Sequence, residues 1–218
     1  MRRSRAAAEI TRTRVFRAAL EAFAARGVRA TSLEDVASLA GVTRGSVYGH
    51  FESKAALVAE IIDQLQWPMD IGPEIAAYRS HPEPLHLLRD HMWRQMTRCM
   101  DDPDQWRAAQ LVLLPLERAE LPAGAATRIG RTMGEAVERL SQVMTLAWER
   151  RQLREGLQPA CVARCLHSVG IAVLAEHANR QEGCGPHASS LSIDLFMAGA
   201  RRDAATVQSG TGLHRSLV

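Results

Sequence analysis

Several kinds of residue are scarce in this 218-residue sequence, and each scarcity excludes some fold classes or cellular locations. Aromatic residues make up only 5% and β-branched runs are few, whereas Ala and Leu are abundant, which favours helices over sheets. The four cysteines, Cys99, Cys161, Cys165 and Cys184, lack the spacing of a disulfide framework, so we expect a reducing, cytoplasmic location. No apolar run reaches about 18 residues, so no membrane span and no membrane partner are expected, and the basic start lacks the apolar stretch of a signal peptide.

Lysine is almost absent, since Lys54 is the only one in the chain. Residues 1–54 hold nine arginines and this lysine against five acidic residues, a net charge of +5. The formal charge of the whole chain is +3, so the remainder carries about −2. Such an asymmetry indicates that one end meets a polyanion, with an ordinary solvated basic surface as the alternative.

Catalytic motifs are also missing from the sequence. It has no nucleophile elbow, P-loop, HExxH motif or glycine-rich dinucleotide motif, so we predict neither an enzymatic activity nor a cofactor. Cys161, Cys165 and His167 suggest a metal at first sight. However, His167 lies about 200° around a helix from Cys165, and a tetrahedral ion needs more ligands, so no metal site is expected.

Two short helical patterns follow a first helix predicted at about 7–26. Thr31 and Glu34 have the spacing of a capping box, which predicts that a helix begins at Thr31. Gly41 closes that helix, and the three residues from Gly41 to Thr43 are typical of the turn in a helix-turn-helix.

The third helix has the residues that a helix in the major groove needs. Val47 and Phe51 form its inner face, while Arg44 can bridge O6 and N7 of a guanine. Lys54 opposes the dipole of the following helix, and a DNA phosphate bound there would remove the conflict; the alternative is a lysine that projects into water. We predict a DNA-binding surface of Thr31, Ser32, Thr43, Arg44, Gly45, Ser46, Tyr48, His50 and Lys54.

The run from Thr11 to Leu57 resembles the DNA-binding domain of the TetR family of transcriptional regulators. The matching residues are Thr11-Arg12, Val15, Ala19, Phe23, Gly27, Thr31-Ser32-Leu33, Asp35-Val36-Ala37, Ala40-Gly41-Val42-Thr43-Arg44-Gly45, Tyr48, His50-Phe51 and Lys54. Gly49 departs from the pattern, because many relatives have a large or polar side chain there that points at DNA. We therefore expect either looser specificity or recognition carried by Arg44 and Thr43.

The resemblance implies an all-α, nine-helix fold with a helix-turn-helix DNA-binding domain at 1–56 and a ligand-binding and dimerisation domain at 57–203. A flexible tail is expected at 204–218. The pattern predicts later helices at about 83–101, 104–117, 124–152, 159–181 and 188–203, and Pro68, Gly72 and Pro73 either kink or end the fourth helix. The stretch from His81 to Leu85 is similar to the AcrR-type efflux regulators of the family.

Methionine and tryptophan recur along the central helices, as in adaptable apolar binding sites, although plain core packing is the alternative. Relatives have a cavity between these helices, which the resemblance implies here, lined by Trp93, Met96, Met100, Trp106, Leu113, Met133, Val137, Met144 and Trp148. The last two helices are apolar on more than one side, which predicts a second subunit against them rather than a monomer core. Their predicted interface residues are Leu166, Val169, Val173, Leu174, Leu191, Leu195 and Ala198.

The function implied by the resemblance is that of a dimeric repressor on a pseudo-palindromic operator in double-stranded DNA. An apolar small-molecule effector would release it, and its target would be a multidrug efflux transporter gene. A regulator of fatty-acyl or aromatic metabolism is the alternative within the family. A different class stays open as well, because Gly49 favours a small-molecule binding protein or enzyme that has this fold and does not read DNA.

Overall fold

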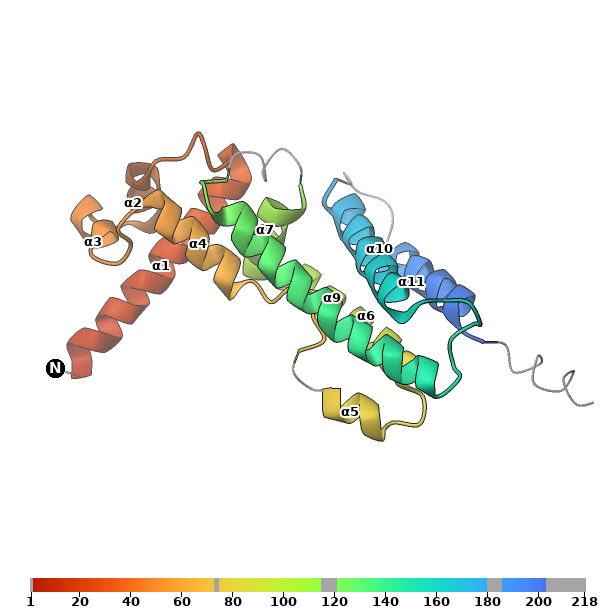
Figure 1. Cartoon of the computed structure of the whole chain (residues 1–218). Helices are drawn as coiled ribbons and strands as arrows, with labels where there is room; N and C mark the ends of the chain where they lie inside the picture. Colours follow the sequence, from red (N-terminus) through yellow and green to blue (C-terminus); the bar gives the residue numbers. More distant parts are fainter. Residues whose placement is uncertain (1, 73–74, 115–120, 180–185, 203–218) are drawn as a thin grey trace, which may run out of the picture.

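The computed structural model describes residues 2–72, 75–114, 121–179 and 186–202, and every regular element in these ranges is a helix (Figure 1). The predicted all-α fold is confirmed. The helices are α1 (Arg2–Arg26), α2 (Leu33–Ala40), α3 (Arg44–Tyr48), α4 (Lys54–Gln64), α5 (Ile75–Ser80), α6 (Pro84–Asp101), α7 (Pro103–Leu113), α9 (Ala125–Glu149), α10 (Pro159–Asn179) and α11 (Pro186–Ala200). Within the described ranges α5 is an addition to the nine predicted helices, and the predicted tail at 204–218 lies outside those ranges.

α1, α2 and α3 form a group at one end of the molecule, where the first part of α1 projects beyond the other two (Figure 1). Their core consists of side chains with at most 3% exposure, among them Val15, Phe23, Val36, Val47 and Phe51. The predicted inner face of the third helix is therefore confirmed. Burial of these apolar side chains on one side of each short helix leaves the opposite side of α3 uncovered.

α4 joins this group to the rest of the chain and ends at Gln64. Of the two predicted outcomes at the following prolines and glycine, the early end is correct. The segment 65–72 that follows, here called the linking segment, is not helical. Its side chains Trp67, Met69 and Ile71 are at most 4% exposed, so the segment passes through the interior.

The linking segment is fastened to α10 by two contacts. Trp67 donates a hydrogen bond from Nε1 to Nε2 of His167, over 3.1 Å. Met69 packs directly on Gly170, where the Cβ of any larger residue would collide with the methionine thioether. A larger residue at this position of α10 would therefore force the buried thioether of Met69 to shift.

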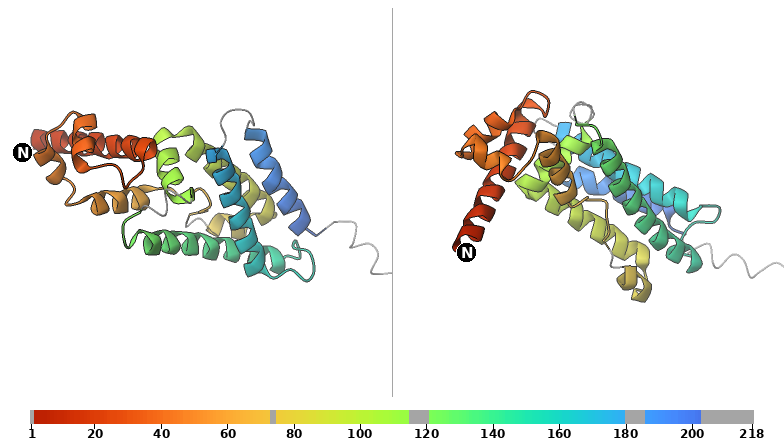
Figure 2. Two further views of the ribbon diagram at one scale, coloured as in Figure 1. Left: turned by 90° about the horizontal axis from the view of Figure 1, so that it is seen from above. Right: turned by 60° about the vertical axis from the view of Figure 1, so that its left-hand side comes forward.

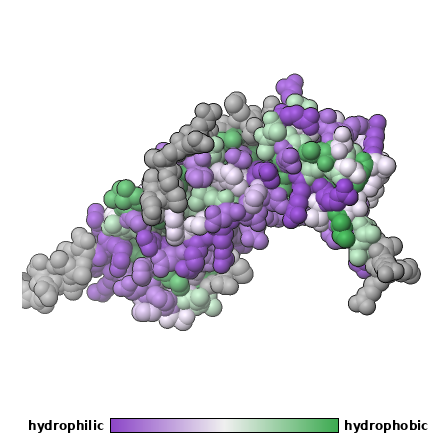
Figure 3. All heavy atoms as spheres, turned by 180° about the vertical axis from the view of Figure 1, so that it is seen from behind, coloured by the Kyte–Doolittle hydropathy of each residue, from purple (hydrophilic) through white to green (hydrophobic). Residues whose placement is uncertain are grey.

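The larger part of the molecule is a layered bundle built on α9. α9 packs against α10 and α6, and α11 packs against both α10 and α6. Figure 2 shows α10 and α11 side by side at the end opposite to α3. Seen from behind, the surface is mainly hydrophilic, with apolar side chains in separate small groups (Figure 3).

One described helix bears on the expectation about long apolar segments. Pro159–Ala178 in α10 is long and apolar enough, by length and composition, to cross a membrane. The sequence-based expectation considered uninterrupted runs, whereas Arg164 and Glu176 interrupt this stretch without making it polar overall. In the fold the helix packs between α9 and α11, and 39% of its apolar window is buried within the chain.

Candidate functional site

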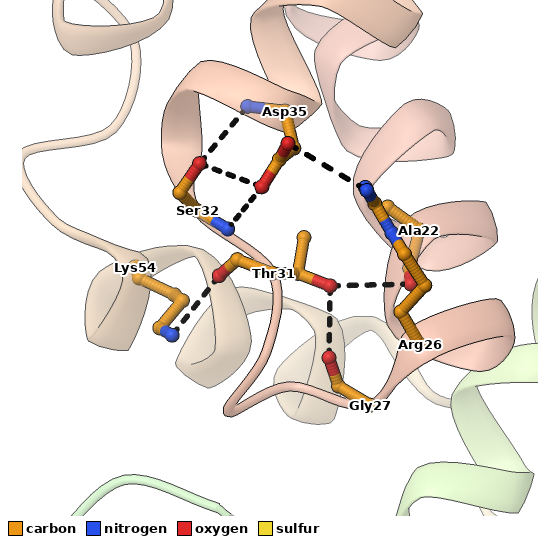
Figure 4. A network of polar contacts seen from close by, with 7 residues as sticks. All are labelled: Ala22, Arg26, Gly27, Thr31, Ser32, Asp35 and Lys54. Atoms are coloured by element: carbon orange, nitrogen blue, oxygen red, sulfur yellow. Dashed lines mark hydrogen bonds and ion pairs between the residues drawn. The ribbon is translucent and has the colours of Figure 1, made fainter.

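The start of α2 differs from the prediction by one residue. Ser32 is the cap: its Oγ accepts a hydrogen bond from the N–H of Asp35 (3.1 Å), and Asp35 Oδ2 accepts one from the N–H of Ser32 (2.8 Å) (Figure 4). Hydrogen bonds from the Ser32 hydroxyl and backbone lower the pKa of the Asp35 carboxyl below its usual range. The predicted box of Thr31 with Glu34 is wrong, because both pairs have the same spacing and only tertiary packing selects between them.

Thr31 and Lys54 also have roles other than the predicted contact with DNA. Thr31 is 1% exposed, and its hydroxyl donates to the carbonyl of Gly27 over 2.8 Å. Lys54 Nζ donates to the carbonyl oxygens of Val28 (2.8 Å), Arg29 (3.3 Å) and Thr31 (3.0 Å), an arrangement that we call the Lys54 clamp. Figure 4 shows the contact with Thr31. An ammonium has three donors, so the clamp uses all of them within the protein, which counts against the predicted phosphate contact.

The turn and the start of α3 agree with the sequence pattern. Gly41 has the left-handed conformation, with φ of 62°, and closes α2 as predicted. Thr43 caps α3, because its Oγ1 accepts a hydrogen bond from the N–H of Ser46 over 3.2 Å. Gly49 ends α3, and a Cβ there would make only ordinary contacts, at 3.4 Å from the carbonyl oxygen of Ser46. Packing therefore does not require glycine at this departure from the family pattern.

The uncovered side of α3 brings most of the predicted DNA-binding residues together. Thr43, Arg44, Gly45 and Tyr48 are exposed along one short helix and its cap. The remaining side chains of the predicted set, apart from the two corrected above, are exposed Ser32 and half-buried Ser46 and His50. Cationic, hydroxyl and aromatic groups on a projecting helix are the groups that contact phosphates and base edges.

Glu34 has a contact with this surface that sequence reasoning missed. Its Oε1 lies 2.7 Å from Nε of Arg44, and the guanidinium carbon of Arg44 lies 5.4 Å from the centre of the Tyr48 ring. The Tyr48 hydroxyl, and then the Glu34 carboxylate, raise the pKa of Arg44 above its ordinary value. The spacing of ten residues between Glu34 and Arg44 has no helical signature, so only the fold reveals this pair.

Two arginines of α1 support the helix pair from within the same group. Arg14 donates from Nη2 to the carbonyl oxygen of Ala40, at the end of α2, over 2.6 Å. Arg12 pairs with Glu60 of α4 over 2.5 Å, and its guanidinium carbon lies 5.3 Å from the centre of the Phe51 ring. Part of the positive charge at this end is therefore structural, which the charge count alone could not distinguish.

The predicted effector-binding residues differ widely in burial. Met96, Leu113 and Met144 are buried in the core, whereas Trp148 is 57% exposed on α9. The remaining members are partly buried: Trp93, Met100, Trp106, Met133 and Val137. For the buried methionines, plain core packing, which was the alternative, fits the structure.

A cavity of about 260 Å³ lies instead where the linking segment meets α6 and α7. Its wall has polar groups beside one indole, and it is lined by Gln66, Trp67, Gln95, Arg98, Cys99, Asp102 and Gln105. Gln105 Oε1 accepts a hydrogen bond from the N–H of Gln66 over 2.8 Å, and its Nε2 donates to the carbonyl of Gln64 over 3.3 Å. The cavity therefore adjoins the end of α4.

The predicted interface residues divide into two sets. Leu166, Val173 and Leu174 are buried within the chain, which corrects their assignment to a surface between subunits. Leu191 and Leu195 are 56% and 64% exposed on α11; Ala198 is exposed and Val169 is half-buried. Leu195 also lines an apolar groove of about 500 Å³ between α10 and α11, to which exposed Cys161 and Cys165 contribute.

Comparisons with known proteins agree with this arrangement. Residues 15–61 match the family model for bacterial regulatory proteins of the tetR family. The HTH-type transcriptional repressor BepR of Brucella suis is 27% identical over 209 residues, 96% of each chain. TtgR of Pseudomonas putida is 40% identical over 41% of this chain and 42% of its own length. The crystal structure of NalD, described as the secondary repressor of the MexAB-OprM multidrug efflux pump in Pseudomonas aeruginosa, has a TM-score of 0.72 at 27% identity, over 89% of this chain and 98% of NalD.

Proposed function

Since this chain belongs to the TetR family of bacterial transcriptional regulators, we propose that it is a ligand-responsive repressor of a multidrug efflux transporter gene. It acts in the cytoplasm as a homodimer, and it is not an enzyme. The observation that carries the proposal is the exposed start of α3, where Arg44 projects beside the hydroxyl of Thr43. BepR and NalD are described as repressors, which supports repression as the direction of the regulation.

In this proposal the N-terminal and C-terminal parts of the chain have different functions. Residues 1–56 read DNA through α3, and residues 57–203 bind the effector and dimerise. Exposed Leu191 and Leu195 on α11 give the second subunit an apolar surface to cover. Two copies related by a two-fold axis place their α3 helices one DNA turn apart, about 34 Å, on a pseudo-palindromic operator.

The effector acts through the linking segment. Trp67 and Met69 of this segment are in contact with α10, while the cavity lined by Gln66 and Trp67 adjoins the end of α4. An apolar small molecule that repacks this part of the interior favours one position of α4 over another. The effector can change the affinity for DNA only by as much as its own affinity differs between the two positions of α4.

DNA binding is tested with a duplex selected by the purified protein from a random library. Fluorescence anisotropy should show binding that is selective and that weakens steeply with salt. Arg44→Gln should lower affinity by about 1–3 kcal/mol and relax selectivity at one base pair of each half-site. Arg94→Gln removes an exposed arginine from α6 and serves as the matched control, with affinity unchanged. Selection of no sequence by the wild-type protein contradicts the proposal.

The effector class is tested by thermal shift with three panels of compounds: hydrophobic drugs, fatty-acyl compounds and small aromatic acids. A compound at 100 times its Kd should stabilise the fold by about 2.7 kcal/mol. The same compound should release the selected duplex in the anisotropy assay. Stabilisation by acyl compounds or aromatic acids alone would replace the efflux role with a metabolic one.

A further inference from the structure

Glu34 places a negative charge on the surface that the proposed function brings to DNA. It is the second residue of α2, and its carboxylate pairs with Nε of Arg44, the first residue of α3, at 2.7 Å. The side chains are 47% and 65% exposed, so the pair lies at the surface. The Tyr48 ring, 5.4 Å from the guanidinium carbon of Arg44, restrains the same group from a second side.

This carboxylate is not needed to start α2. The capping box of Ser32 and Asp35 already satisfies the first turn of the helix, and Asp35 supplies the acidic group that the helix dipole favours there. A carboxylate beside the DNA-binding helix also costs affinity for any duplex, because it repels phosphates and occupies a cation. The position of Glu34 therefore calls for a role that offsets this cost.

Non-specific and specific complexes make different demands on Arg44. In a non-specific complex an arginine contributes by reaching whichever phosphate is nearest, which requires a mobile side chain. In a specific complex it contributes by meeting the O6 and N7 atoms of one guanine, which rewards a guanidinium that is already held in place. The contacts with Glu34 and Tyr48 hinder the first use and assist the second.

We infer that Glu34 is a specificity-determining residue, which withholds Arg44 from the phosphates of non-operator DNA and positions it for a base of the operator. The inference rests on the proposed function and adds a residue that acts through Arg44. It also accounts for selectivity in a chain where Gly49 has no side chain to offer. Glu34 is thus a positioning residue, and its effect should appear in the ratio of two affinities.

The test compares Glu34→Gln with the wild type on the selected duplex and on a shuffled duplex of the same composition. Affinity for the shuffled duplex should rise about 3–10-fold, and its logarithmic salt slope should steepen by about 0.9, the value for one more phosphate contact. Affinity for the selected duplex should change by less than about twofold. Arg44 is no longer held in place, which weakens binding, but Glu34 no longer repels the phosphates, which strengthens it. The selectivity ratio should therefore fall.

Two further variants separate the ion pair from simple charge. Glu34→Asp keeps the charge and is one methylene shorter, so it loses the 2.7 Å pair and should resemble Glu34→Gln. Glu52→Gln removes an exposed acid from the turn after α3, and it should shift both duplexes by the same factor. If Glu34→Asp retains the wild-type ratio, or if Glu34→Gln shifts both duplexes equally, the inference is wrong.

The double variant Glu34→Gln with Arg44→Gln completes the cycle. In the Arg44→Gln background the substitution of Glu34 should no longer change the selectivity ratio, because the group that it positions is gone. A ratio that still falls assigns the effect to another residue and overturns the inference. Wild-type protein that selects no duplex contradicts the proposed function instead, so the two failures are distinguishable.

Discussion

Lys54 Nζ lies 3.0 Å from the carbonyl oxygen of Thr31, 23 residues earlier in the chain, and so ties the start of α4 to the loop before α2. Two more carbonyls of the same loop, those of Val28 and Arg29, accept hydrogen bonds from the same ammonium. The three carbonyl oxygens of this loop converge on the position that the ammonium of Lys54 occupies. The only lysine of the chain therefore holds the loop before α2 against the start of α4.

Lys54→Met should lower the free energy of unfolding by about 1–3 kcal/mol, the cost of leaving partly buried carbonyls without donors. Urea unfolding measures this loss. The salt slope of DNA binding should stay at the wild-type value, because the ammonium is engaged within the protein. Lys54→Arg keeps the charge and is the control: it should also destabilise the fold, since a planar guanidinium does not reproduce the three donors of the clamp. A stable Lys54→Arg protein with normal DNA binding contradicts the clamp.

Ser32→Ala should destabilise α2 by the general cost of a lost N-cap hydroxyl, about 1 kcal/mol. The folded pKa of Asp35 lies below its ordinary value of 3.8, so its contribution to stability is present above that value and disappears as pH falls through the folded pKa. The variant moves the pKa of Asp35 back toward 3.8. The stability difference from wild type should therefore shrink below about pH 4 in urea unfolding. Ser38→Ala, in an exposed position of the same helix, should show no such pH dependence.

Gly170→Ala should destabilise the protein by about 1–3 kcal/mol, because the added Cβ collides with the buried Met69 thioether and forces repacking. Gly134→Ala is the matched control, since nothing lies within 4 Å of its added Cβ on α9. That substitution should stabilise the protein by about 0.5–1 kcal/mol through helix propensity alone. Thermal unfolding of both variants should show stability changes of opposite sign. Changes of the same sign would show that Met69 does not pack on Gly170.

Leu195→Asp should convert the proposed homodimer into monomer. The side chain is 64% exposed on α11 and lines the apolar groove between α10 and α11. A central interface residue contributes 2 kcal/mol or more, so the dimer dissociation constant should rise at least about 30-fold in sedimentation equilibrium. Leu39→Asp changes an exposed leucine of α2 and should leave the oligomeric state unchanged. A dimer that survives Leu195→Asp contradicts the proposed interface.

Local patterns predicted much of the DNA-binding end. Gly41 and Thr43 bound a turn whose geometry depends on their own backbone and side chains, and Val47 and Phe51 follow helical spacing. Such features need few distant contacts, so the sequence contains them in readable form. The early end of α4 was one of two outcomes expected from its prolines and glycine, for the same reason.

Features that depend on distant contacts could not be read in this way. Whether Thr31 or Ser32 caps α2 is decided by which hydroxyl the fold buries, and the role of Lys54 is decided by a loop more than 20 residues away. The methionine and tryptophan pattern was equally ambiguous, because Met144 in the core and Trp148 at the surface lie four residues apart on the same helix. Pairing and packing across elements, rather than spacing, set these outcomes.

The burial of the linking segment determines how the two ends of the molecule can move relative to each other. To swing freely, α4 would have to withdraw Trp67, Met69 and Ile71 from the interior, at about 1.5–3 kcal/mol for each side chain. We therefore expect any movement of α4 to be an exchange between discrete packing arrangements, which in proteins generally takes microseconds to milliseconds. The packing of the linking segment inside the larger bundle therefore determines the orientation of the proposed DNA-binding helices, although none of its residues belongs to the proposed DNA-binding surface.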